Sequence, residues 1–128
     1  MCQTNSITEH FTTDEMKCKH CGECHMDMDF MEVLEDIREA YGKPMYVVSG
    51  YRCPVHNMNV SNTGRTGPHT TGKAVDIAVA GVNAYTLLAA ALYHGMTGIG
   101  VSQKGPVSTR FLHLDMIHSN LRPRIWSY

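Results

Sequence analysis

Two short segments with strict alternation of side-chain character constrain the fold of this chain most. Residues 73–81 (KAVDIAVAG) and residues 109–117 (TRFLHLDMI) alternate as β-strands do, because successive side chains of a strand point to opposite faces of a sheet. In the first segment, Asp76 lies on the face opposite to its apolar neighbours. In the second, His113 and Asp115 share the face opposite to the leucines. The pattern predicts two strands that bury one face and carry polar, ionisable groups on the other.

The remaining segments predict a mixture of helices and strands without regular βαβ alternation. Apolar residues recur every three or four positions in residues 29–42 and 83–95, which indicates two helices. Asp29 and Asn83 are expected to cap these helices, and the glycines at 42 and 95 to end them. Further strands are expected over residues 45–50 (buried) and 97–103, with a long polar loop over residues 51–72 and a helical turn after Pro54. We therefore expect an α+β fold with a largely antiparallel sheet packed with helices.

Length and composition indicate one domain over residues 1–128. The formal net charge of −1, without a basic segment, argues against a nucleic-acid partner. No apolar run approaches the roughly 20 residues of a membrane helix. Residues 1–14 form a polar arm without the apolar core of a signal peptide, which predicts synthesis in the cytoplasm and action elsewhere only after release. We expect a monomer.

A candidate metal site involves His69, which precedes Asp76 by seven residues, with Gly72 between them to allow a turn. A carboxylate within an apolar strand needs a partner. Two imidazoles, one carboxylate and an open fourth position suit a catalytic zinc site, with His113 as the second imidazole. On spacing alone, an ordinary turn and a solvated sheet face remain the alternative interpretation.

Four motifs in order resemble one known family. They are SGYRCPVHN (49–57), HTTGKAVDI (69–77), GIGV (98–101) and FLHLDM (111–116). Together they resemble the zinc D-alanyl-D-alanine carboxypeptidases, a family that includes phage-type endolysin peptidases and shares its fold with the hedgehog signalling domain. The resemblance extends from about residue 11 to the end of the chain. It implies that His69, Asp76 and His113 are ligands of a catalytic Zn²⁺.

The resemblance further implies a peptidase that hydrolyses an amide bond in peptidoglycan stem peptides. The bond would be the terminal D-Ala-D-Ala bond or an internal one such as L-Ala–D-Glu, and the absence of a wall-binding module fits a phage or prophage lysin. Arg52 would meet a substrate carboxylate or the polarised carbonyl, because its planar fork matches a carboxylate. Ser49 and His56 are expected to help bind the substrate.

Two positions depart from the family pattern. Gly67 stands where relatives often have a serine, and Arg110 stands where several relatives have an acidic general base. Asp115 is the nearest alternative: it would accept a proton from the metal-bound water, support the site indirectly or bind the metal itself. The substitution at position 110 favours a competing hypothesis, in which the chain is a non-catalytic metal-binding module or phage structural component.

A cysteine knuckle over residues 18–25 forms a separate candidate site. Cys18, Cys21 and Cys24 follow a C-x2-C-x2-C pattern, and the chain holds five cysteines in all. One interpretation is a second, structural metal site with Cys53 or a histidine as fourth ligand. A second interpretation is a disulfide to Cys53. A third is free thiols packed under the first helix. Cys2 is expected to be unpaired.

Overall fold

A five-stranded sheet organises the part of the chain that the computed structural model describes, residues 6–128. Residues 1–5, and with them Cys2, lie outside the described residues. The strands are β1 (Tyr46–Ser49), β2 (Ala74–Ala78), β3 (Gly98–Ser102), β4 (Phe111–Asp115) and β5 (Arg124–Ser127), in the spatial order β1-β2-β4-β3-β5. The three pairs within β1-β2-β4-β3 are antiparallel, whereas β5 pairs with β3 in parallel. The predicted α+β class is confirmed.

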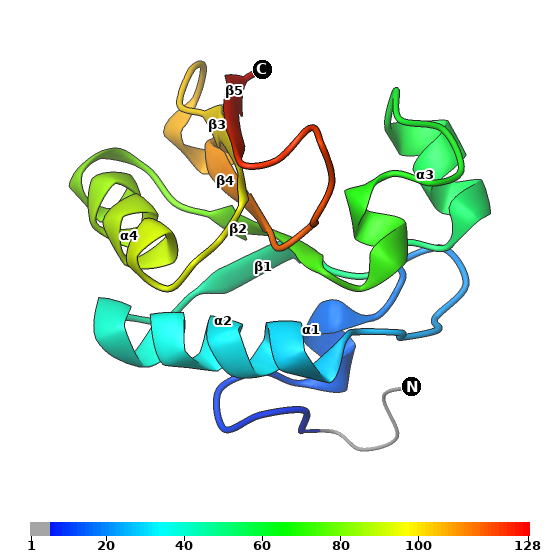
Figure 1. The fold of residues 1–128 in the computed structure, drawn as a ribbon, viewed down its shortest axis with the longest axis horizontal. Coiled ribbons are helices and arrows are strands. Elements are labelled where there is room, and N and C mark those ends of the chain that lie inside the picture. The colour runs from blue at the N-terminus through cyan, green and yellow to red at the C-terminus, as the bar shows by residue number, and fades with distance from the viewer. Residues whose placement is uncertain (1–5) are drawn as a thin grey trace.

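Two longer helices cover one face of this sheet (Figure 1). The helices are α1 (Thr13–Met16), α2 (Met28–Tyr41), α3 (Pro54–Val60) and α4 (Gly81–Tyr93), with single 3₁₀ turns η1 (Pro68–Thr71) and η2 (Val107–Thr109). The core lies between the sheet and the pair α2 and α4, and the apolar side chains of the alternating strands point into it. These strand residues are Val75, Ile77, Leu112 and Leu114, all essentially inaccessible to solvent.

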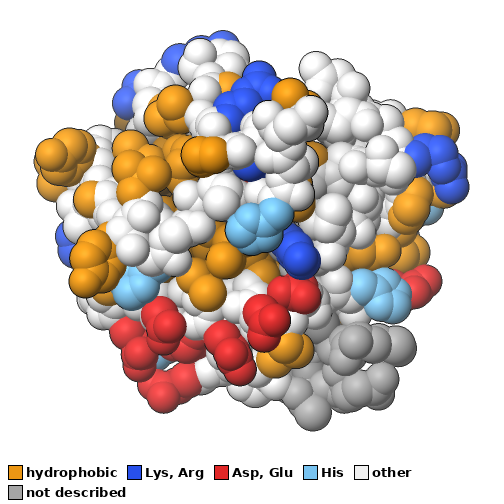
Figure 2. Space-filling model, in the orientation of Figure 1, with side chains coloured by type: hydrophobic (Ala, Val, Ile, Leu, Met, Phe, Trp, Pro, Cys, Tyr) orange, Lys and Arg blue, Asp and Glu red, His pale blue; other side chains and the backbone are white. Residues whose placement is uncertain are grey.

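The helix α2 follows from its sequence pattern and its two ends. Phe30, Leu34 and Ile37 are buried at helical spacing, while the outward face carries acidic residues that gather at the lower edge of Figure 2. Gly42 adopts the left-handed conformation and ends the helix, as predicted. The cap is Asp27 rather than Asp29, because the Asp27 carboxylate accepts the backbone N–H of Phe30 at 2.9 Å.

Helix α4 begins two residues before its predicted start. Ala80 occupies the N-cap position, and the predicted cap Asn83 lies within the first turn. The Asn83 side-chain oxygen instead accepts a hydrogen bond from Lys43 Nζ at 2.7 Å. Asn83 therefore joins the helix to the segment before β1 and does not cap it.

Both edges of the sheet differ from the prediction. Residues 45–50 were expected to form a buried strand, but β1 lies at the edge of the sheet and exposes Tyr46 and Val48. At the other edge, β5 was not predicted, because its residues show no clear alternation of apolar and polar side chains. This last strand brings the C-terminal segment against β3 and, as shown below, against the polar face of β4.

The segment expected to form a polar arm is anchored to the domain over its described residues, 6–14. Phe11 is buried in the core, and Thr12 forms a reciprocal capping box with Glu15 at the start of α1. The backbone N–H of His10 donates to Glu35 of α2 at 2.9 Å. Among the described residues, no helix has the length and apolar character needed to cross a membrane.

Candidate metal centre

Strand register brings the two halves of the candidate site together. Asp76 of β2 is the direct cross-strand partner of His113 of β4. His69 lies in the 3₁₀ turn η1, and Gly72 follows it with a left-handed φ of 75°, so that the chain turns back into β2. A side chain at Gly72 would also overlap the carbonyl of His25. The predicted turn at Gly72 is therefore required both by its backbone conformation and by close packing.

The three side chains converge on one point. The Nε2 atom of His69 lies 3.3 Å from Asp76 Oδ1, and the Nδ1 atom of His113 lies 3.0 Å from the same oxygen. One ligand atom from each residue lies within 4.8 Å of the other two, and all three residues are buried. Zinc bonds of about 2.1 Å in a tetrahedral site imply ligand atoms about 3.4 Å apart. The spacing of these donors therefore fits a bound metal ion.

Hydrogen bonds fix which nitrogen of each imidazole faces the site. The Nδ1 atom of His69 lies 2.8 Å from the carbonyl oxygen of Gly50, which can only accept, so Nδ1 donates there and Nε2 is the nitrogen that faces Asp76 and could bind a metal. The Nε2 atom of His113 lies 2.7 Å from Asp115 Oδ2, which leaves its Nδ1 facing Asp76. Metal-binding histidines commonly have such a partner on the second ring nitrogen.

Asp115 is held behind His113. It is 0% exposed, and Arg122 donates to both of its carboxylate oxygens, at 3.0 Å from Nε and 2.8 Å from Nη2. Although burial raises the pKa of Asp115, hydrogen bonds from His113 and Arg122 lower it to about 2. Of the three roles considered for Asp115, this geometry fits the indirect one: the carboxylate orients the His113 ring.

Asp76 stays ionised although it is buried. Burial raises the pKa of a carboxyl group, but hydrogen bonds from His113 and His69 hold the pKa of Asp76 well below its usual range. Arg52 adds a positive charge, with Nη2 at 3.5 Å from Asp76 Oδ2. The centre therefore presents an ionised carboxylate between two imidazoles and a guanidinium.

The predicted substrate-side residues divide into two groups. Arg52 lies beside the triad, where its Nε donates to Ser49 Oγ at 3.1 Å and its Nη1 donates to Asn57 Oδ1 at 3.2 Å. Its side chain is 15% exposed. His56, by contrast, lies beside the cysteine cluster, where its ring stacks on His20 with centroids 5.8 Å apart.

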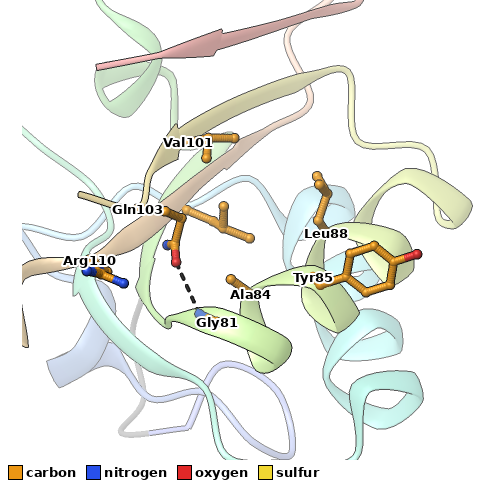
Figure 3. A pocket seen from close by; sticks show the side chains of 8 residues that line it. Gly81, Ala84, Tyr85, Leu88, Val101, Gln103 and Arg110 are labelled. Carbon is orange, nitrogen blue, oxygen red and sulfur yellow. Dashed lines mark hydrogen bonds between the residues drawn. The ribbon is translucent and has the colours of Figure 1, made fainter. Parts of the chain in front are cut away.

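The departures at positions 67 and 110 have structural reasons. A side chain at Gly67 would overlap Thr63 and come within 2.8 Å of the Asn57 amide nitrogen, so the position leaves room for that pair. Arg110 belongs to the opposite face of the sheet, where it donates to the carbonyl of Gly105. Figure 3 shows it at a pocket of about 330 Å³ beside α4, which lies apart from the metal centre.

The cysteine cluster is a trio that differs from the predicted set. The sulfur atoms of Cys18, Cys21 and Cys53 lie within 4.8 Å of one another, whereas Cys24 lies in the hydrophobic core. Although burial raises the pKa of Cys18, hydrogen bonds from the backbone of Cys53, Cys21 and His20 lower it to about 7. The pKa of Cys21 is raised instead: a hydrogen bond from the backbone of Glu23 lowers it, but burial and the neighbouring sulfurs of Cys18 and Cys53 raise it overall. The ligand group of the structure is therefore Cys18, Cys21 and Cys53, and Cys24 of the predicted set is not part of it.

Sequence reasoning missed the groups that cover the centre. The indole ring of Trp126 in β5 lies against His113, with centroids 5.2 Å apart, and the Arg122 guanidinium stacks on that indole at 4.9 Å. A side chain at Gly100 would come within 2.7 Å of Trp126 Nε1, and one at Gly98 would overlap the Asp115 carboxylate. The GIGV motif is the signal that could have indicated this cover, because glycines in a strand mark close approach.

We expect Gly98→Ala to weaken Zn²⁺ binding at the triad by about 10- to 100-fold, the range seen when partners of metal ligands are lost. The added methyl group would displace the Asp115 carboxylate from His113. Isothermal titration of the metal-free protein with Zn²⁺ measures the effect. Ser102→Ala on the same face of β3 is the matched control and should bind as wild type does. Equal affinity of Gly98→Ala and wild type would contradict this account of Asp115.

We also expect Zn²⁺ affinity at the triad to fall as the pH is lowered. Burial lowers the pKa of His113, but the hydrogen bonds that its ring donates to the Asp115 and Asp76 carboxylates raise it above the ordinary value overall. Below that raised pKa the metal must displace a proton, so the affinity falls by up to about tenfold per pH unit. Asp76 contributes no slope there because it stays ionised. Competition with a chelator at a series of pH values tests this, and a constant affinity would argue against it.

Comparison with known proteins agrees with the motifs. The model of the family described as Peptidase M15 matches residues 9–115, which include every residue of the triad as well as Arg52 and Asp115. A search of curated proteins finds no match. The matched region covers most of the chain, and the chain belongs to the Peptidase M15 family.

Proposed function

We propose that this chain is a zinc-dependent peptidase that hydrolyses an amide bond in peptidoglycan stem peptides. The observation that carries the proposal is the buried triad of His69, Asp76 and His113, whose ligand atoms face one another beside the guanidinium of Arg52. Membership of the Peptidase M15 family supports the reaction class. The substrate class comes from the motif resemblance and from the chemistry of Arg52.

The residues of the site have separable tasks. A zinc ion bound here would lower the pKa of a bound water toward about 7 and polarise a carbonyl group. Asp115 and Arg122 hold the His113 ring so that Nδ1 faces the centre. Ser49 and Asn57 hold Arg52, whose remaining N–H groups are available to a substrate carboxylate. Stem peptides carry such carboxylates at a terminal D-Ala or on side chains.

Two bonds suit this arrangement, and the proposal covers both. Arg52 would meet the terminal carboxylate of D-Ala-D-Ala in a carboxypeptidase reaction, or the acidic side chain next to an internal L-Ala–D-Glu bond. We propose that the protein is made in the cytoplasm, acts as a monomer on the cell wall after release, and serves in phage or prophage lysis.

A second candidate function is metal binding without hydrolysis, in a binding module or a phage structural component. Two observations favour it. Arg110 stands where several relatives have an acid and points to the other face of the sheet. The oxygens of Asp115 are already paired with His113 and Arg122, so this carboxylate is poorly placed to accept a proton from water.

Incubation of the zinc-loaded protein with purified peptidoglycan separates the two functions. We expect new amino termini or released D-Ala, detected by amine labelling and mass spectrometry of the products. His113→Ala should abolish release because it removes a ligand, and circular dichroism should show that this variant stays folded. Absence of release by the zinc-loaded wild type from walls of differing stem-peptide composition would reject the peptidase proposal in favour of the binding module.

Arg52→Lys tests the role of the guanidinium in a peptidase. We expect kcat/KM to fall by about 10- to 100-fold, because lysine cannot reproduce the hydrogen bonds of a charged fork to a carboxylate. Arg65→Lys is the matched control, since Arg65 is an exposed arginine of the 61–67 loop, and it should retain wild-type activity. Similar kinetics for both variants would remove Arg52 from substrate binding.

A further inference from the structure

A second group of metal-binding side chains lies outside the triad and takes no part in the proposed hydrolysis. It joins two distant parts of the chain: Cys18 and Cys21 come from the turn after α1, and Cys53 is the N-cap residue of α3. The backbone N–H of Cys53 donates to the Cys18 sulfur at 3.3 Å. This bond fixes the two segments against each other.

A histidine lies next to the three cysteines. The Nδ1 atom of His20 lies 3.6 Å from Cys53 Sγ. In a tetrahedral zinc site, bonds of about 2.3 Å to sulfur and 2.0–2.1 Å to nitrogen imply a sulfur–nitrogen separation of about 3.6 Å. His20 therefore lies at ligand separation from Cys53, and it stands outside the group of sulfurs that lie within 4.8 Å of one another, so a rotation of its side chain would bring it to Cys18 and Cys21. We propose that Cys18, Cys21, Cys53 and His20 bind one Zn²⁺ in a closed, structural site.

The backbone around the sulfurs supports thiolate ligands. Besides the Cys53 N–H that donates to Cys18, the N–H of His56 donates to Cys53 Sγ at 3.4 Å. Donors aimed at sulfur stabilise its negative charge and keep the ligand oriented. The turn that carries Cys18 and Cys21 closes through Gly22, whose left-handed φ of 78° lets its N–H reach the Cys18 carbonyl at 2.9 Å.

The position of Cys53 gives this ion a structural consequence. Cys53 directly follows Arg52, the residue whose guanidinium lies 3.5 Å from Asp76. An ion bound to Cys53 would tie the backbone beside Arg52 to the turn at residues 18–21. The ion would thereby hold Arg52 in place next to the first metal centre, whether or not that centre hydrolyses peptides.

Metal titration of the reduced protein tests the second site. With Co²⁺ as the probe, thiolate ligands give an intense near-ultraviolet charge-transfer absorption that the histidine and carboxylate triad cannot produce. We expect this absorption in wild type, its loss on addition of Zn²⁺, and two zinc ions per chain by native mass spectrometry. The double variant His69→Ala, His113→Ala should keep the thiolate absorption and one zinc ion.

Variants of the cluster make the test specific. Cys21→Ser alters an exposed residue, and it should lose the charge-transfer absorption and one zinc ion while it keeps the triad ion. His20→Gln should weaken Zn²⁺ binding at the cysteine site by at least about tenfold. His56→Gln is the matched control, because its ring stacks on His20 while its contact with Cys53 comes from the backbone.

Three results would overturn the proposal. The first is reduced wild type that binds one zinc ion and shows no thiolate absorption with Co²⁺. The second is a disulfide between two members of the trio in place of a metal, located by mass spectrometry of peptides from the protein as purified. The third is unchanged binding in His20→Gln together with a loss in His56→Gln, which would assign the fourth position to another histidine.

Discussion

The buried carboxylate of Asp76 is the group on which the rest of this structure depends. An ionised carboxylate inside an apolar sheet is costly unless charged or polar partners surround it. Here the strand register supplies His113, the η1 turn supplies His69, and the segment after β1 supplies Arg52. Each partner comes from a different part of the chain, so the requirement to satisfy one carboxylate fixes how three segments meet. A metal ion at the same point would meet that requirement more fully, and it would explain why the ligand atoms of the three residues lie within 4.8 Å of one another.

The second buried carboxylate extends this arrangement to the C-terminus. Asp115 is inaccessible to solvent and draws Arg122 from the segment that leads into β5, and Arg122 in turn stacks on Trp126. The two glycines of β3 make room for this carboxylate and this indole on the same face. The tail is therefore a part of the centre: it neutralises Asp115, covers His113 and keeps that imidazole from rotating away.

The sequence predicts those parts of the centre that local patterns determine. Alternation in β2 and β4 indicates which faces of the strands carry Asp76, His113 and Asp115. The spacing to Asp76 and the turn at Gly72 add His69, and the motif resemblance adds Arg52. The partners of Asp115 were not predictable in this way. Arg122 and Trp126 lie in a segment without clear periodicity, and β5 pairs in parallel with a strand distant in sequence. Such pairing depends on which strand edge the rest of the sheet leaves unpaired, so it follows from tertiary packing and not from the conformational preferences of the local sequence. The N-cap positions differ for a smaller reason. Two aspartates stand near the start of α2, and Asp27 is the one that accepts the Phe30 N–H. The Asn83 side chain bonds to Lys43, and α4 begins after Ala80 without a side-chain cap.

The motif SGYRCPVHN contributes residues to two sites, the triad and the cysteine cluster. The sequence left a metal site, a disulfide and free thiols as open alternatives, because the C-x2-C-x2-C spacing does not by itself determine which sulfur atoms meet. The fold removes Cys24 from the group and adds Cys53, which lies within the same short stretch, SGYRCPVHN, as Ser49, Arg52 and Asn57.

Arg52 points to the triad, and its neighbour Cys53 points to the cluster. A turn without regular secondary structure would allow Arg52 many orientations, since a long cationic side chain loses considerable conformational entropy when it is fixed. Anchoring the next residue in the chain to a rigid turn reduces that freedom. The adjacency of Arg52 and Cys53 is therefore best understood as a mechanical link between the two centres.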